Sequence, residues 1–358
     1  MSKYKILILG ASYGSLLASK LLFGGHSVKL ICLPEEAELI NSEGFRVRLP
    51  VRGRAEPVEL DSRRLPGEVS AAGADEVNPD EYDLIGLAMQ EPQYGAPGVR
   101  ELIDAIAGSR VPCMSIMNMP PLAYMKRISA INSGMIKPAY TNPEVWDRFD
   151  SGAITLCSPD PQAIRPAGEK LNVLQVTLPT NFKVARFDAE RGNEIVRRLE
   201  KEIDAARFDA PEGKIELPVK LRFYDSVFVP LAKWAMLMAG NYRCITEDGM
   251  RTAKEAVHSD IKASRSIYDF VIEVCVKIGA SLDELVPFEK YAAAAEGLSR
   301  PASAARALNN GAKNIERADK LVQLVAGQKG MRHPMLDGIV ELVDRRLEAN
   351  RRAKNAAA

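Results

Sequence analysis

The chain has 358 residues, which is enough for two domains, because single hydrophobic cores usually stop growing below this size. It carries 48 lysines and arginines against 47 aspartates and glutamates, so it has no overall field that would attract nucleic acid or an acidic membrane. Hydrophobic residues make up 46% and charged residues 27%, a composition that argues against long disorder. We therefore expect a folded protein that binds neither nucleic acid nor membrane.

The cysteines and histidines suggest neither a disulfide framework nor a metal site. The five cysteines are far apart and stand in apolar stretches, which is typical of reduced core thiols. They are Cys32, Cys113, Cys157, Cys244 and Cys275. No pair of cysteines or histidines has metal-ligand spacing, and no apolar run reaches the length of a membrane span. We expect no metal and a cytoplasmic location.

The N-terminal third alternates between strand and helix patterns. Residues 4–9 form an apolar run of strand length, residues 15–23 place four leucines on one helical face, and residues 26–33 form a second strand. Such a β-α-β unit belongs to a parallel sheet. Further strands are predicted at 81–89 and 111–118, with a helix at 98–108 between them. The pattern is typical of a doubly wound α/β fold of the Rossmann type.

The rest of the chain changes character twice. Short β-rich pieces between 150 and 225, with a helix at 190–203, are interpreted as an extension of the first sheet. Beyond residue 228 the period is helical, and helices are predicted at 230–242, 263–279, 301–328 and 335–352. The basic tail 345–358 is interpreted as a helix end. We expect a Rossmann-type domain over 1–222 and an all-α domain for substrate binding and dimerisation over 223–358.

The turn after the first strand, GASYG at 10–14, fits two kinds of chemistry. As G-x-S-x-G it is similar to the nucleophile elbow of α/β-hydrolases, with Ser12 as nucleophile. As a Gly-rich turn before a helix it is similar to a cradle for the pyrophosphate of a dinucleotide. A hydrolase elbow needs several strands before it, and neither His258 nor His333 has the context of a triad base, so the dinucleotide is favoured. A turn without a ligand remains an alternative.

The match to the dinucleotide pattern G-x-G-x-x-G is imperfect, because Ser12 and Ser15 replace two glycines. We predict a turn one residue shorter than usual, in which Gly14 lets the helix approach the strand and serine hydroxyls donate to phosphate oxygens. A short-chain dehydrogenase is excluded, because no tyrosine has a lysine four residues later. The predicted cofactor-binding residues of the turn are Gly10, Ala11, Ser12, Tyr13 and Gly14.

Several motifs resemble the ketopantoate reductase (2-dehydropantoate 2-reductase) superfamily, of which the chain looks like a divergent member. The segments GGHSVKLI at 24–31 and INSEGFRVR at 40–48 resemble its second strand and the segment after it. In DLIGLAMQEPQ at 83–93, Gln90 replaces a lysine that usually lies near the cofactor. MSIMNMPP at 114–121 is similar to a strand ending in Asn-Gly, which puts Asn118 at a position that contacts nicotinamide or substrate.

The resemblance also implies site residues in the helical domain, which is similar to the C-terminal domain of 6-phosphogluconate dehydrogenase. Lys233 in PLAKWAMLMAGNY corresponds to a lysine that holds and protonates the keto oxygen of the substrate. Asn241 keeps the spacing of a second family residue, and Leu237 replaces an asparagine between them. Eight residues are close to two helical turns, so we expect Lys233 and Asn241 to face the same cleft.

The C-terminal signature of the family is the least well matched. In RPASAARALNNGAKNIERAD at 300–319, Ser303 stands for one serine of a family pair, and Ala305-Arg306 replace Gln-Asp. Glu316 is the nearest candidate for an essential glutamate, whereas ungapped alignment from KGMRHP puts Asn314 there. Arg306 would pair with a substrate carboxylate if it faces the cleft, and is otherwise a solvated helix residue.

The cofactor is expected to be NADP(H) rather than NAD(H), from the resemblance alone. Leu33 stands where the family commonly has an arginine, and Glu35 or Glu36 could reach a ribose hydroxyl or simply begin the next helix. We expect an NAD(P)H-dependent reductase of a 2-oxo or related carbonyl acid, a homodimer with hydride transfer in the interdomain cleft. Two alternatives stay open: an opine-dehydrogenase-like imine reductase that uses His258, and a non-catalytic dinucleotide-binding or sensing protein.

Overall fold

The computed structural model describes residues 3–356, with side chains described up to residue 353. The chain divides into two compact units. The first holds the described residues up to Met89 together with 93–124 and 144–227, and the second holds 90–92, 125–143 and the described residues from Phe228 onward. The boundary thus lies five residues after the predicted one.

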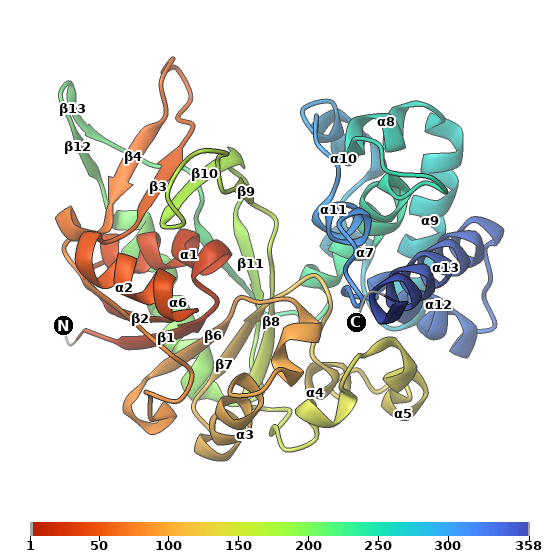
Figure 1. Cartoon of the computed structure of the whole chain (residues 1–358), viewed down its shortest axis with the longest axis horizontal. Helices are drawn as coiled ribbons and strands as arrows, with labels where there is room; N and C mark the ends of the chain where they lie inside the picture. The colour runs from red at the N-terminus through yellow and green to blue at the C-terminus, as the bar shows by residue number, and fades with distance from the viewer. Residues whose placement is uncertain (1–2, 357–358) are drawn as a thin grey trace. The chain divides into compact units, whose positions relative to one another are not determined.

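The main sheet of the first unit has eight strands in the order β14-β11-β8-β7-β6-β1-β2-β5 (Figure 1). All neighbouring pairs are parallel except β8 and β11. The strands are β1 (Lys5–Leu9), β2 (Ser27–Ile31), β5 (Glu68–Ala72), β6 (Leu84–Leu87), β7 (Cys113–Ile116), β8 (Ile154–Ser158), β11 (Phe182–Ala185) and β14 (Leu221–Tyr224).

The connection from β1 to β2 runs toward one edge of the sheet, and the connection from β6 to β7 runs toward the opposite edge. Because such crossovers are right-handed, α1 (Ala11–Phe23) and α3 (Val99–Ser109) lie on opposite faces of the sheet. The predicted doubly wound α/β pattern is confirmed.

A second sheet covers α1 from the side away from the main sheet. Its four strands follow the order β4-β3-β10-β9, with bounds β3 (Arg46–Leu49), β4 (Val58–Asp61), β9 (Gln162–Ile164) and β10 (Val173–Leu178). Leu17 and Leu21 of α1 share one buried core with Val47 of β3 and Leu174 of β10. The interpretation of 150–225 as an extension of the first sheet is therefore wrong for β9 and β10, which pair with β3 and complete the second sheet.

Two further helices and a hairpin complete the first unit. They are α2 (Pro34–Glu43), α6 (Glu190–Ala205) and the hairpin of β12 (Phe208–Ala210) and β13 (Gly213–Ile215). A short helix, α4 (Leu122–Met125), follows β7. Ile195, Val196 and Leu199 of α6 are buried in the same core as α1. A helix with its charged residues on the opposite face is what the sequence of 190–203 predicts.

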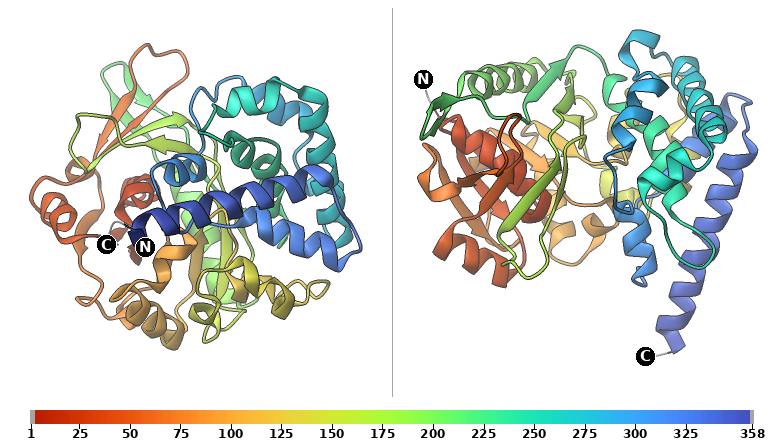
Figure 2. Two further views of the ribbon diagram at one scale, coloured as in Figure 1. Left: turned by 45° about the vertical axis from the view of Figure 1, so that its right-hand side comes forward. Right: turned by 90° about the horizontal axis from the view of Figure 1, so that it is seen from above.

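The second unit is built of helices (Figure 2). One helical segment is buried among them. That segment, the central helix, consists of α7 (Lys233–Met236), a π-helical turn (Leu237–Asn241) and a 3-10 turn (Tyr242–Cys244). The other helices are α5 (Ser133–Ile136), α8 (Ala253–His258), α9 (Ile261–Lys277), α10 (Phe288–Ala295), α11 (Ser303–Asn309), α12 (Ala318–Gln328) and α13 (Pro334–Ala356). Residues 357–358 of the predicted helical tail lie outside the described residues.

Two predictions for the second unit are corrected by the structure. The helix predicted at 301–328 is broken over 310–317, where Gly311 adopts a φ of 82° that ends a helix readily. Residues 125–143, which the sequence places in the first domain, pack with the helices instead. The backbone N–H of Asn132 donates to Oε1 of Gln328 at 2.8 Å, and Lys329 donates to the carbonyl of Ala130.

Among residues 3–356, no helix is long and apolar enough to cross a membrane. The same part of the chain holds no cluster of three or more His, Cys, Asp or Glu side chains that could bind a metal ion. All five cysteines are free thiols, four of them buried and Cys32 half-buried.

Candidate functional site

The turn after β1 contains a single residue, Gly10, because α1 begins at Ala11. Gly10 has a φ of 99°, and a Cβ there would lie 2.7 Å from the carbonyl oxygen of Ala88. The helix therefore starts four residues before the predicted Ser15. The N–H of Gly10 donates to Ile31 and that of Gly14 to Gly10, at 2.8 and 3.2 Å.

The first turn of α1 offers three backbone donors at the carboxyl edge of the sheet. The N–H groups of Ala11, Ser12 and Tyr13 belong to that first turn and have no intrahelical acceptor. The turn carries no acidic side chain, and Ser12 is exposed beside it. Backbone donors of this kind at a helix N-terminus bind anions such as phosphate, so the residues present fit the pyrophosphate of a dinucleotide.

Gly14 and Tyr13 serve the packing of this turn. A Cβ on Gly14 would lie 2.7 Å from Cγ2 of Ile8, so only glycine permits the approach of α1 to β1. The Tyr13 hydroxyl donates to the carbonyl of Pro161 at 2.6 Å, and its ring packs edge-on against Phe182. Burial raises the pKa of Tyr13 well above its ordinary value. Only the backbone of Tyr13 is left for a cofactor.

The hydrolase alternative has no base for Ser12. His26, the histidine of the first unit, is 2% exposed, with Nδ1 accepting from the N–H of Tyr4 and Nε2 lying 2.8 Å from Glu202. His333 lies in the second unit, 3.1 Å from the hydroxyl of Ser266. Both ring nitrogens of His26 are thus engaged away from Ser12, and a triad is not formed there.

Gln90 and Asn118 follow strands that end level with β1. Leu9 of β1 pairs with Leu87 of β6, which pairs in turn with Ser115 of β7. The carboxyl ends of these parallel strands form the edge at which ligands bind in open α/β sheets. Gln90 and Asn118 each follow their strand within three residues and are half-buried.

The end of β2 presents an ion pair that the sequence does not reveal. Leu33 is 76% exposed, and Glu36, in the first turn of α2, is paired with Arg165, which follows β9. Burial raises the pKa of Glu36, and the charge of Arg165 opposes that rise. Glu35 is exposed.

The central helix of the second unit exposes one stripe. From Val229 to Ile245, every residue is buried except Lys233, Met236 and Asn241, which are half-buried. In a regular α-helix, residues eight apart lie about 80° apart around the axis. The π turn holds more residues than an α turn and reduces this offset. Lys233 and Asn241 thereby share the stripe.

Tyr291 of α10 accompanies the π turn. Its hydroxyl donates to the carbonyl of Met236 at 3.1 Å, where the α-helical pattern ends. A Cβ on Gly240 would lie 1.9 Å from that hydroxyl, so glycine is required for the tyrosine to enter. A side chain that inserts into the helical ladder is a recognised cause of such irregular turns.

Glu316 is held against the central helix. The Tyr242 hydroxyl, next to Asn241 in the chain, donates to the carbonyl of Glu316 and accepts the N–H of Ala318 at 2.9 Å. Oε1 of Glu316 lies 3.4 Å from the N–H of Glu91, which is 2% exposed. The carboxylate of Glu91 accepts the N–H of Thr141 at 3.1 Å. Neither Glu91 nor Tyr242 is predicted from the sequence as a site residue.

The two candidates for the family glutamate differ in their surroundings. Glu316 is 7% exposed, whereas Asn314 is exposed and its Oδ1 accepts from Arg351 at 2.9 Å. Of the two, Glu316 is the one that contacts the central helix, through the hydroxyl of Tyr242. Ser303 begins α11 and is exposed, as is Arg306 one turn later.

Both ring nitrogens of His258, at the C-terminal end of α8, have contacts within the second unit. Its Nε2 lies 3.1 Å from the carbonyl of Ala292, and its Nδ1 lies 3.4 Å from Glu296. Both ring nitrogens thus contact residues of α10 or its C-terminal end. This arrangement gives no support to the imine reductase alternative, which needs a histidine free to act on substrate.

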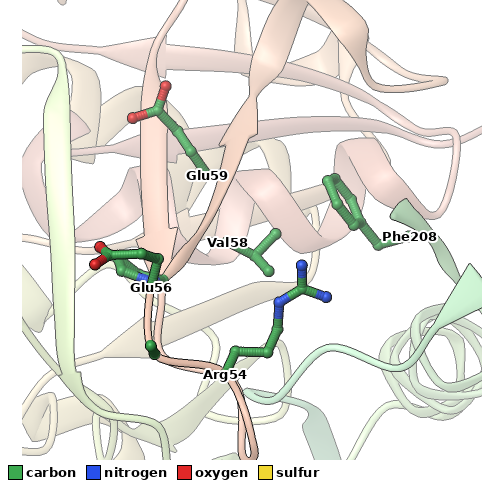
Figure 3. A pocket seen from close by; sticks show the side chains of 7 residues that line it. Arg54, Glu56, Val58, Glu59 and Phe208 are labelled. Carbon is green, nitrogen blue, oxygen red and sulfur yellow. The ribbon is translucent and has the colours of Figure 1, made fainter. Parts of the chain in front are cut away.

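A shallow hollow of about 430 Å³ lies elsewhere in the first unit, between the β3–β4 hairpin and β12 (Figure 3). Val58 and Phe208 supply apolar side chains there, and Arg54 reaches across to Glu212 in an ion pair. None of the predicted site residues lines it, so it does not bear on the candidate site.

The fold of the whole chain is shared with solved oxidoreductase structures. The 2-dehydropantoate 2-reductase of Methylococcus capsulatus matches with a TM-score of 0.65 at 15% identity over 97% of both chains. A D-mandelate dehydrogenase solved with NADH and anilino(oxo)acetate matches with a TM-score of 0.63 at 15% identity, over 97% of this chain and 99% of that one. The dimeric ketopantoate reductase of Staphylococcus aureus gives 0.62 at 10% identity, with the same coverage.

No protein-family model matches the chain, and no curated protein sequence does. The structural matches extend over nearly the full length of both partners, so they cover the doubly wound domain and the helical domain together. The expected fold, a Rossmann-type domain followed by an all-α domain, is confirmed.

Proposed function

We propose that the protein is an NAD(P)H-dependent reductase of a 2-oxo acid or a related carbonyl acid, a divergent member of the ketopantoate reductase superfamily. The observation that carries the proposal is the end-to-end structural match to 2-dehydropantoate 2-reductase and D-mandelate dehydrogenase. Both are named for oxidoreductions that interconvert a 2-oxo acid and a 2-hydroxy acid.

The first unit supplies the cofactor site of this proposal. The N–H groups of Ala11, Ser12 and Tyr13 and the hydroxyl of Ser12 bind the pyrophosphate, while Gly10 and Gly14 hold the turn in place. Asn118, which follows β7 in the same unit, contacts the nicotinamide in this proposal. When bound, the reduced nicotinamide supplies the hydride that goes to the carbonyl carbon of the substrate.

The second unit supplies the acid. A hydride that reaches the carbonyl carbon leaves negative charge on the oxygen, which a nearby ammonium stabilises and then protonates. Lys233 has this role in the proposal, with Asn241 on the same stripe as a hydrogen-bond donor to the substrate. Glu316 binds a polar group of the substrate, and Ser303 contacts its far end.

Reduction of a panel of 2-oxo acids by NADPH or NADH, followed by the loss of cofactor absorbance, tests the proposal. Wild type should turn over at least one member, and Lys233→Ala should lower kcat about 100-fold or more, because positioned acids contribute that much. Its dissociation constant for the cofactor should stay within about twofold, since Lys233 lies in the other unit.

Met236→Ala is the matched control, because Met236 lies on the same stripe and its side chain has no titratable group. It should lower kcat far less than Lys233→Ala does. Equal turnover by wild type and Lys233→Ala would remove Lys233 from its assigned role. Cofactor binding without turnover of any carbonyl acid would favour the non-catalytic dinucleotide-binding protein.

We also propose a homodimer that binds a small carboxylate substrate, supported by the structural match to a dimeric ketopantoate reductase. Sedimentation of the purified protein should give a mass near twice the 39.2 kDa of one chain. A mass of one chain at micromolar concentration would contradict it.

A further inference from the structure

The ion pair between Arg165 and Glu36 joins segments 129 residues apart in the sequence. Nη2 of Arg165, just beyond β9, meets Oε1 of Glu36 in the first turn of α2. The side chain of Glu36 is 10% exposed, whereas that of Arg165 is 32% exposed. The guanidinium is therefore the member of the pair that faces solvent, and the carboxylate lies behind it.

The segment that carries Arg165 is fixed at both ends. At one end, the carbonyl of Pro161 accepts the Tyr13 hydroxyl from the first turn of α1 at 2.6 Å. At the other end, Arg165 is held by Glu36 in the first turn of α2. Residues 161–165 thus run from the N-terminus of one helix to that of the next.

These two helix N-termini correspond to the two parts of a dinucleotide site. In Rossmann folds the pyrophosphate lies at the N-terminus of the first helix, and the adenosine ribose lies beyond the end of the second strand. The second strand here is β2, which ends at Ile31, five residues before Glu36. Arg165 accordingly stands at the ribose end of the proposed cofactor site.

Arg165 retains donors for a ligand. A guanidinium has five N–H donors, and Glu36 accepts from Nη2. Its Nε is buried, so the donors that a ligand can reach are those of its two terminal nitrogens. A planar group with free donors, oriented from behind by a carboxylate, suits a phosphate, which accepts two parallel hydrogen bonds from one arginine.

We propose that Arg165 binds the 2′-phosphate of NADP(H) and that Glu36 is a positioning residue for its guanidinium. The inference rests on the proposed function, because it needs a dinucleotide at this edge. Leu33 stands at the end of β2, where the family commonly has an arginine. Arg165, which follows β9 of the second sheet, thus supplies the positive charge that such an arginine would supply. A site selective for NAD(H) would instead expose the carboxylate to the ribose hydroxyls.

Equilibrium titration of the full chain with NADPH, NADH and 2′,5′-ADP tests this assignment. The last probe carries the 2′-phosphate without the nicotinamide, so it reports the ribose end alone. Wild type should bind NADPH more tightly than NADH. Arg165→Gln should weaken NADPH and 2′,5′-ADP about 10- to 100-fold, which is the effect of one charge-assisted hydrogen-bonded pair, and should leave NADH within about threefold.

Arg165→Lys should recover part of the lost NADPH affinity, because an ammonium keeps the charge without the planar donor pair. Glu36→Gln should weaken NADPH binding, but by less than Arg165→Gln does, because the guanidinium stays and loses only the carboxylate that holds it. Arg48→Gln is the matched control: Arg48, in β3 of the second sheet, is 28% exposed and pairs with Glu59 and Glu169. It should leave all three affinities within about twofold.

The outcomes separate two failures. If wild type binds neither NADPH nor NADH, the proposed function falls and this inference with it. If wild type binds NADPH but Arg165→Gln keeps the wild-type ratio of NADPH to NADH affinity, only the role of Arg165 is overturned. Tighter binding of NADH than NADPH by wild type overturns it as well. Unchanged NADH binding by Arg165→Gln shows that this variant is folded.

Discussion

Lys20 is a lysine buried in the core of the first unit, and replacing it with methionine should make the protein more stable at low pH. The residue lies in α1, is 1% exposed, and donates from Nζ to the carbonyl of Pro218 at 2.6 Å. Burial, helped by the nearby charge of Lys220, lowers the pKa of Lys20 from 10.5 to about 7.

The magnitude follows from this difference in pKa. Below pH 7 both the folded and the unfolded chain carry the charge, and the folded state loses about 4.7 kcal/mol by burying it. As the pH rises above 7 the folded state releases the proton first, so wild type gains stability up to pH 10.5. Methionine fills similar space but gives up the hydrogen bond to Pro218, which costs about 1–3 kcal/mol.

Lys20→Met should therefore be about 2–4 kcal/mol more stable than wild type at pH 6, and the advantage should shrink by about 2.7 kcal/mol at pH 9. Urea unfolding of both proteins at the two pH values measures this, with Lys201→Met on the exposed face of α6 as control. The control should change the unfolding free energy by less than about 0.5 kcal/mol. A stability difference between Lys20→Met and wild type that is equal at both pH values would refute the reasoning.

Two further substitutions test the packing that holds the candidate site. Gly14→Val should cost about 1–3 kcal/mol in urea unfolding, because its Cβ would lie 2.7 Å from Ile8; Gly108→Ala in α3, where a Cβ meets open space, should be neutral or stabilising. Tyr242→Phe should cost about 1–3 kcal/mol, since the carbonyl of Glu316 and the N–H of Ala318 lose their partner. A loss below about 0.5 kcal/mol in either variant would contradict these contacts.

Local periodicity predicts most strands of the main sheet, but not β5, and it predicts the longest helices. The apolar runs that became β1, β6 and β7 are buried on both faces, which is why they read as continuous rather than alternating. Leu16, Leu17, Leu21 and Leu22 are all buried, as their helical spacing predicts. These elements are determined by residues that lie close to each other in the sequence.

The failures of prediction lie where distant segments decide the structure. The pairing of β10 with β3 joins residues more than a hundred positions apart, and nothing local indicates it. Residues 125–143 belong to the second unit through contacts with residues 328–329, almost two hundred positions away, which no local pattern reveals. The early start of α1 follows from Gly10, whose positive φ turns the chain in one residue.

For the candidate site, the sequence named Gly10, Lys233 and Glu316 but missed three residues that the structure adds. Glu91 and Tyr242 contact Glu316, and Arg165 contacts Glu36, over separations of 74 to 225 positions, so no spacing rule finds them. The π turn is equally invisible, because it depends on the Tyr291 hydroxyl entering beside Gly240. The local signal that could have been used for Glu91 is its place four residues after the apolar strand β6, at the carboxyl edge of the sheet.

The central claim, hydride transfer from a reduced nicotinamide to a carbonyl acid, is tested most directly by following the transferred atom. NADPH deuterated at the reactive carbon of the nicotinamide is incubated with the protein and a panel of 2-oxo acids, and the products are analysed by mass spectrometry. We predict a 2-hydroxy acid that carries one deuterium on the carbon next to the carboxylate. Deuterated cofactor that remains intact with every 2-oxo acid, although the cofactor binds, would contradict the account.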